Sequence, residues 1–203
     1  MLGFIHEIRI VCCIFVMVLL SSCSAISYYS QSVAGQLELI SLQRNLSEVM
    51  NSRDTPVDIK ERLAKILEIR DFASEVLKLP NNNSYRSYAD IGRKFIVWNV
   101  FATPELSLQP HQSCFLFVGC LSYRGYFKKA QAGAYKQSLE NQGYDVYLAG
   151  VAAYSTLGWF DDPILNSMLE RDDNDLARLI FHELAHQQLY IKDDSEFNEA
   201  FAD

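Results

Sequence analysis

Apolar and polar residues alternate in the first half of the chain at the intervals typical of α-helices. Between residues 27 and 50, apolar residues recur at near-helical spacing among Gln, Glu and Arg, and a second such stretch runs from about Val57 to Leu79. We therefore predict two amphipathic helices joined near Thr55-Pro56. Pro56 suits the start of the second helix, and the turn formers Pro80 to Asn83 end it.

The second half of the chain changes to short apolar segments separated by helical patterns. Three segments are short, aromatic and β-branched and are predicted to be strands: residues 95–101, 113–118 and 144–151. Helices are predicted over residues 127–141, before Gly143, and over residues 175–190. This order of helices, strands and helices predicts an α+β fold.

Residues 1–22 are predicted to be a signal peptide rather than part of the fold. Arg9 precedes an apolar run over residues 10–20, which as a helix spans about 16 Å at ~1.5 Å per residue, about half of a bilayer core. The next residues, Leu20 to Cys23, resemble the bacterial lipobox, which implies that Cys23 is lipidated and begins the mature chain. Ser24 after it implies sorting to the outer membrane. The alternative is a plain signal peptide with a chance cysteine.

The domain left after this cut, residues 23–203, is acidic. The chain's net charge is −7, and because Glu7 and Arg9 leave together the balance does not change. No cluster of Lys and Arg supplies the electrostatic term that phosphate-backbone binding needs, so nucleic-acid partners are excluded. We expect a protein of the cell envelope that faces the periplasm and meets the membrane through its lipid anchor.

Two cysteines outside the signal peptide, Cys114 and Cys120, can form a disulfide in an exported protein. A straight strand would hold their Cα atoms about 20 Å apart, whereas a disulfide spans roughly 4.4–6.8 Å. A bridge therefore requires a chain reversal, for which Gly119 is the one obvious turn residue. Two buried free thiols are the alternative.

The sharpest motif is the run His182-Glu183-Leu184-Ala185-His186 in the last predicted helix. Residues four apart share one helix face, so both imidazoles can bind one zinc ion. Glu183 lies on an adjacent side, where it can take a proton from zinc-bound water whose pKa falls to about 7. The alternative is a surface helix with two solvated histidines.

A catalytic zinc site needs a third protein ligand and an open position for water. The acidic residues that follow are Asp193, Asp194, Glu196 and Glu199. Glu199 fits best, because a turn after His186 allows a second helix to begin near Ser195, although spacing alone does not exclude Glu196. The segment from Asn198 to Asp203 resembles the glutamate-zincin pattern of thermolysin-like peptidases, which implies that Asp203 orients His182.

Eight segments add a resemblance over essentially the whole mature chain: Tyr28–Gln31, Gly35–Leu37, Ile69–Ala73, Tyr88–Gly92, Val97–Ala102, Tyr123–Phe127, Gly150–Pro163 and Phe181–Gln187. Together they resemble the bacterial predicted aminopeptidase family of lipoproteins. The resemblance implies a zincin-like peptidase that binds Zn²⁺ through His182, His186 and Glu199 and uses Glu183 as base on a peptide substrate. Family members continue past residue 203, which implies that a subdomain closing the cleft is missing here.

Other matched segments suggest contacts with substrate. Gly150 to Ser155 can supply the edge strand along which a peptide aligns, or can be an ordinary buried strand. Tyr154 and Tyr190 are candidates for stabilising the transition state, and Tyr154 also for binding substrate.

Charged residues offer two further candidates. Arg124 can bind a substrate carboxylate, although a structural pair is the commoner role for such an arginine. Asp161 and Asp162 can bind the ammonium group of a peptide, but a solvated turn before Pro163 is favoured.

Two functions follow from these patterns. The first is a membrane-anchored zinc peptidase, with aminopeptidase action implied by the resemblance. The second is a non-catalytic zinc-binding envelope lipoprotein that acts as a binding or regulatory module.

Overall fold

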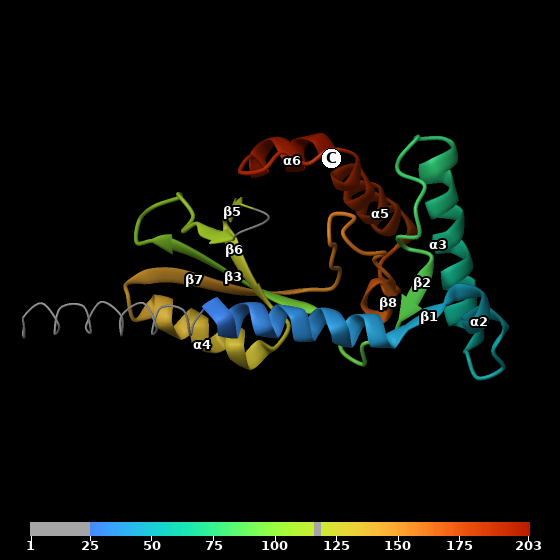
Figure 1. Cartoon of the computed structure of the whole chain (residues 1–203), viewed down its shortest axis with the longest axis horizontal. Helices are drawn as coiled ribbons and strands as arrows, with labels where there is room; N and C mark the ends of the chain where they lie inside the picture. The colour runs from blue at the N-terminus through green and yellow to red at the C-terminus, as the bar shows by residue number, and fades with distance from the viewer. Residues whose placement is uncertain (1–24, 116–118) are drawn as a thin grey trace, which may run out of the picture. The chain divides into compact units, whose positions relative to one another are not determined.

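The computed structural model describes residues 25–115 and 119–203 (Figure 1). The predicted signal peptide, the predicted lipidation at Cys23 and residues 116–118 of the second predicted strand lie outside the described residues. The chain divides into two compact units, residues 1–38 and Leu39–Asp203, which we describe separately. Residues 25–42 are helical, and the second unit begins within this helix. Of the helices in the described part of the chain, none is both long and apolar enough to cross a bilayer.

The second unit contains both helices and short sheets, which confirms the predicted α+β class. Its helices are α2 (Leu46–Asn51), α3 (Val57–Glu75), α4 (Lys129–Glu140), the 3₁₀ turn η1 (Asn166–Met168), α5 (Asp173–Gln188) and α6 (Ser195–Ala202). Its strands are β1 (Gln43–Asn45), β2 (Ser87–Ala89), β3 (Val97–Pro104), β4 (Ser113–Phe115), β5 (Gly119–Leu121), β6 (Tyr123–Tyr126), β7 (Tyr144–Val151) and β8 (Ile164–Leu165).

The strands form two three-stranded sheets and a hairpin. In one sheet β3 is central and pairs antiparallel with β6 and with β7, over a register that runs from Val97 opposite Val151 to Pro104 opposite Tyr144. The other sheet has the order β1-β2-β8, with β2 parallel to β8. Among the described residues β7 pairs with β3 alone, so it is an edge strand of its sheet.

The first predicted helix, over residues 27–50, is interrupted at Gln43–Asn45 and resumes as α2. Gln43–Asn45 pairs with β2 instead, and the Asn45 side chain then caps α2 by accepting a hydrogen bond from the Ser47 N–H at 2.9 Å. The second helix ends at Glu75 rather than Leu79. Its end is closed by Lys78 at a φ of 61° and by the Leu79 N–H, which donates to the Ala73 carbonyl at 3.0 Å. Periodicity does not predict the strand at residues 43–45 or the end of the second helix at Glu75, because both depend on where the backbone turns.

Other boundaries agree with the sequence prediction. The β7 strand has the predicted bounds, α4 lies within the predicted residues 127–141, and α6 begins at Ser195. Five short strands, β1, β2, β5, β6 and β8, were not predicted, because segments of two to four residues carry too little alternation to reveal a strand.

The main core lies between α3, α5 and the β1-β2-β8 sheet (Figure 1). Leu63 and Ile66 of α3 and Ile180 and Leu184 of α5 are fully buried there. Each such side chain stabilises the fold by about 1.5–3 kcal/mol. Burial of this face fixes the rotation of α5 about its axis, and so decides where its histidines point.

Cys114 and Cys120 form a disulfide across the β4–β5 hairpin, where they are directly opposite in the register. The Cys120 N–H donates to Asp193 Oδ1 at 2.8 Å. A Cβ at Gly119, whose φ is +81°, would collide with the same carboxylate. The hairpin is therefore packed closely against the turn that precedes α6.

Candidate metal centre

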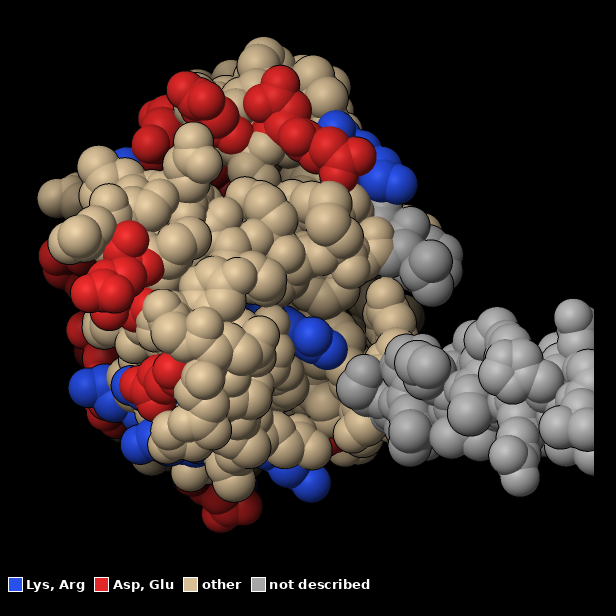
Figure 2. Space-filling view, turned by 90° about the vertical axis from the view of Figure 1, so that its left-hand side faces the viewer, with Lys and Arg blue, Asp and Glu red and all other residues tan. Residues whose placement is uncertain are grey.

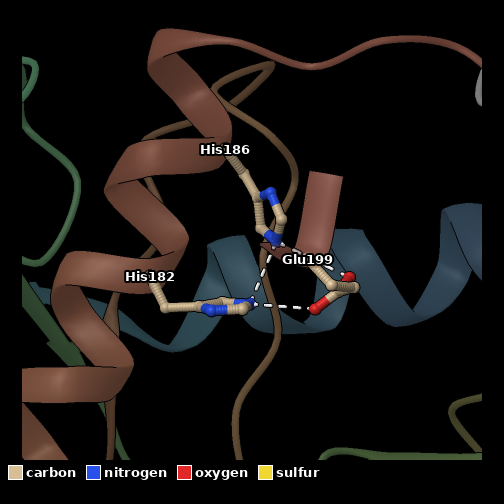
Figure 3. A group of neighbouring side chains, drawn as sticks. All are labelled: His182, His186 and Glu199. Atoms are coloured by element: carbon tan, nitrogen blue, oxygen red, sulfur yellow. Dashed lines mark hydrogen bonds and ion pairs between the residues drawn. The ribbon is translucent and has the colours of Figure 1, made fainter. Parts of the chain in front are cut away.

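Helix α5 carries the first two candidate ligands, His182 and His186, one turn apart. Asp172 begins the helix by accepting a hydrogen bond from the Asp175 N–H at 2.9 Å. With Ile180 and Leu184 held in the core, the two imidazoles point to the opposite side, toward α6 (Figure 3). The motif of residues 182–186 therefore lies on a helix, as the sequence predicted.

Helix α6 carries Glu199, and local hydrogen bonds fix its place beside α5. Asp194 caps α6 by accepting from the Phe197 N–H at 3.1 Å. The buried Asn198 side chain accepts from the Ile191 N–H at 2.8 Å and donates to the Ile191 carbonyl at 2.7 Å. These bonds tie α6 to the turn after α5, and α6 packs on α5. An eight-residue helix needs such support, because isolated helices of this length are unstable.

His182, His186 and Glu199 converge on one point (Figure 3). The two Nε2 atoms are 3.0 Å apart, His182 Nε2 is 3.2 Å from Glu199 Oε2, and His186 Nε2 is 3.8 Å from Glu199 Oε1. Ligands bound tetrahedrally to zinc at ~2.1 Å lie about 3.4 Å from one another. The donor set and its spacing could therefore hold a metal ion.

The electrostatics of the three residues also fit a cation. His186 is 6% exposed, and burial, together with the adjacent His182, lowers its pKa, which favours the neutral imidazole. Neutral imidazole is the form that binds metal.

The Glu183 side chain has different neighbours from those of the two histidines. It acts electrostatically on the buried Tyr85. Burial raises the pKa of Glu183, and the neighbouring Ser155 and His182 oppose that rise. A carboxyl group whose pKa is shifted toward neutrality is suited to accept and return a proton.

Asp162 does not lie in a solvated turn, so that expectation was wrong. It is 1% exposed, and burial raises its pKa to about 6. Its carboxylate accepts hydrogen bonds from the Thr156 N–H and hydroxyl, both at 2.9 Å. Asp161 next to it is exposed. The sequence does not reveal which of two adjacent aspartates turns inward.

Hydrogen bonds around Gln187 also support the site and were not predicted from the sequence. Gln187, which follows His186, accepts from Asn82 Nδ2 at 2.7 Å and donates to Ser84 Oγ at 3.3 Å. The loop that bears these residues is held by Arg70 of α3, which is fully buried. The Arg70 guanidinium donates to the carbonyls of Pro80, Asn82 and Ser84 at 2.8, 3.0 and 2.8 Å. An arginine at a core position of a predicted helix was the available signal, because such burial requires several acceptors.

Asp203 lies near His182 but does not hydrogen-bond it. Asp203 Oδ1 is 3.8 Å from His182 Nδ1, while Arg178 holds the same carboxylate at 2.8 Å. That hydrogen bond lowers the pKa of Asp203. Asp203, which was predicted to orient His182, therefore lies near that histidine but is paired with Arg178.

The tyrosine candidates differ in their distance from the site. The Tyr190 ring lies 6.2 Å from the His186 ring, centroid to centroid. The Tyr154 ring packs edge-on against Phe127, at 5.3 Å. Of the two tyrosines, Tyr190 is therefore the one that lies near a candidate metal ligand, His186.

Arg124 lies on β6 and stacks over aromatic rings. Its guanidinium carbon is 4.9 Å from the Tyr135 ring centroid and 5.8 Å from that of Tyr126. These contacts pair the guanidinium with aromatic rings of β6 and α4.

Acidic side chains gather around the metal ligands. The exposed acids of α6 and of the turn before it are Asp193, Asp194, Glu196, Glu199 and Asp203. Figure 2 shows red side chains along the top of one face, the end at which Figure 1 places α6. Such a surface attracts cations, including metal ions and ammonium groups.

A family model described as "Putative aminopeptidase" matches residues 27–203 of the chain. No curated protein and no solved structure matches it.

Proposed function

Because the chain belongs to the family described as "Putative aminopeptidase", we propose that it is a zinc-dependent peptidase of zincin-like architecture that removes residues from peptide N-termini. The observation that carries this proposal is the convergence of His182, His186 and Glu199 from α5 and α6, beside the buried Glu183. These three residues would hold the ion. When bound, zinc supplies Lewis acidity that polarises the scissile carbonyl and acidifies a water molecule.

Glu183 is the proton carrier in this proposal. Its carboxylate accepts a proton as the water oxygen forms a bond to the carbonyl carbon. The same proton then passes to the leaving amine when the C–N bond breaks, which restores the carboxylate. The raised pKa of Glu183 favours holding the proton between these two steps.

The acidic surface around α6 supports aminopeptidase rather than carboxypeptidase action, since it favours a protonated peptide N-terminus over a carboxylate. In the same proposal the protein is anchored by lipid on Cys23 and faces the periplasm from the outer membrane. The Cys114–Cys120 disulfide is consistent with such an oxidising compartment.

The proposal is tested by measuring bound zinc and peptide hydrolysis together. Wild type should bind one zinc per chain and release the N-terminal residue from peptides, whereas N-acetylated peptides should resist cleavage. Glu183→Gln should keep its zinc and lose about 10²–10⁴-fold in rate. Glu199→Ala should lose zinc, while Glu196→Ala, an exposed glutamate on the same helix, is the matched control and should keep it.

Two results would contradict parts of the proposal. Full zinc content in Glu199→Ala would remove Glu199 from the ligand set. Zinc retention without hydrolysis of any peptide would refute the enzyme and favour the non-catalytic zinc-binding lipoprotein.

A further inference from the structure

The β4–β5 hairpin contacts the turn that leads into α6. The Cys120 N–H donates a hydrogen bond to Asp193 Oδ1 at 2.8 Å, although the two residues are 73 positions apart in the sequence. Gly119, at a φ of +81°, passes so close to this turn that a Cβ there would overlap the Asp193 carboxylate and lie 3.1 Å from Lys192 Cγ. The hairpin therefore meets the turn through both a hydrogen bond and close packing.

The disulfide fixes the direction in which the Cys120 N–H points. Cys114 and Cys120 are directly opposite in the register, with their Cα atoms 3.9 Å apart. A separation this short is typical of a non-hydrogen-bonded pair, in which the backbone N–H groups point away from the partner strand. The Cys120 N–H is therefore directed out of the hairpin, where Asp193 accepts it. Because the bridge keeps the two cysteines opposite each other, it also preserves this direction.

The conformation of Asp193 determines where α6 begins. Its φ is 65°, in the left-handed region that costs free energy for most residues other than glycine, so neighbouring contacts are needed to hold it there. The next residue, Asp194, accepts from the Phe197 N–H at 3.1 Å and caps α6. The helix that starts at this cap carries Glu199. A change in the turn would therefore move the start of α6 and, with it, the Glu199 carboxylate.

We propose that Asp193 is a positioning residue, through which the disulfide-linked hairpin holds Glu199 beside His182 and His186. Its role in metal binding rests on the proposed function, whereas the contact between the hairpin and the turn does not. The eight residues of α6 are too few for a stable isolated helix, so α6 depends on its contacts to stay docked on α5. A metal ion that needs Glu199 binds only the docked state, so its affinity falls in proportion to the docked fraction.

The contact is tested first in metal-free protein, so that the outcome does not depend on zinc. Backbone hydrogen exchange of α6 and α3 is measured by mass spectrometry in the full chain, with thermal melting to establish that each variant is folded. Asp193→Gly keeps the left-handed turn accessible but has no carboxylate. Its α6 amides should exchange about 3- to 10-fold faster, the effect of losing one hydrogen bond, and its α3 amides at the wild-type rate. Asp193→Asn retains an acceptor oxygen and should restore wild-type exchange.

The part played by the disulfide is tested in the same assay. Replacing both Cys114 and Cys120 by Ala should speed α6 exchange to a similar extent. Combining this change with Asp193→Gly should add less than about twofold, because both changes release one contact. Fully additive effects, or wild-type exchange of α6 in Asp193→Gly, would overturn the proposal.

Zinc affinity, measured by competition with a chelator, then tests the positioning of Glu199. Asp193→Gly should bind zinc about 2- to 5-fold more weakly, since only the undocked part of the population is lost, and Asp193→Asn should bind like wild type. Glu196→Gln, which removes an exposed charge from α6, is the matched control and should also bind like wild type.

Two outcomes of this measurement would overturn the proposal. Unchanged affinity in Asp193→Gly would show that the hairpin does not position Glu199. Equal weakening in Asp193→Asn would assign the effect to the lost charge rather than to the lost hydrogen bond. If wild type binds no zinc, the proposed function fails, while the exchange of α6 still decides whether the hairpin holds this helix in place.

Discussion

Replacing Asp162 by Asn should change how the stability of the protein depends on pH. The substitution keeps the size of the side chain and removes its charge from a site that is 1% exposed. At low pH, where Asp162 is also neutral, the variant should be less stable by about 1–2 kcal/mol, because its amide group cannot accept every hydrogen bond from Thr156 and Ser155.

The magnitude of the pH effect follows from the burial of the carboxylate. Burial raises the pKa of Asp162 from its ordinary 3.8 to about 6. Each pKa unit corresponds to ~1.36 kcal/mol, so the difference amounts to about 3 kcal/mol. Because the folded state binds the proton more tightly, this stability is fully present below the unfolded pKa and is lost as pH rises through the folded pKa. Wild type should therefore lose about 3 kcal/mol between about pH 4 and pH 7 relative to Asp162→Asn.

Urea unfolding, followed by tryptophan fluorescence, measures this difference. Both proteins are unfolded at a series of pH values with a chelator present, so that metal binding does not contribute. The free-energy gap should shift by about 3 kcal/mol in favour of the variant as pH rises. Repeating the pair in a Glu183→Gln background removes the neighbouring carboxyl, whose pKa Asp162 also raises. Parallel pH curves for wild type and variant would refute the buried, pKa-shifted carboxylate.

Three further substitutions test the packing that supports the site, each by urea unfolding. Arg70→Met leaves the carbonyls that its guanidinium pairs without donors and should cost about 3 kcal/mol; a cost below about 1 kcal/mol would show that water replaces the guanidinium. Replacing both Cys114 and Cys120 by Ala should cost about 2 kcal/mol, because the short loop no longer restrains the unfolded chain, and reductant should have that effect on wild type alone. Ile180→Ala should cost about 2–5 kcal/mol through a cavity beneath the histidines, against less than about 0.5 for the exposed Val57→Ala.

Helical periodicity was sufficient to place the motif. Apolar residues at one face of residues 175–190 predicted the helix that carries His182 and His186, and the turn residues before Ser195 predicted the helix that carries Glu199. Spacing left Glu196 as an alternative to Glu199, and the structure turns Glu199 toward the histidines because Asn198 is buried against Ile191. That contact depends on how the chain folds back on itself.

The amino-acid sequence by itself determined the local features of this protein: the α+β order of elements, the face of α5 that bears the two histidines, and the acidic residues near them. These depend on the 3.6-residue repeat and on turn-forming residues, which act over a few positions. Only the tertiary structure decided that Cys114 meets Cys120, that Asp162 rather than Asp161 is buried, and that Asn198 binds the backbone of Ile191. These pairs depend on the packing of loops against helices from distant parts of the chain, where burial and hydrogen bonding select one arrangement among many that local preference allows.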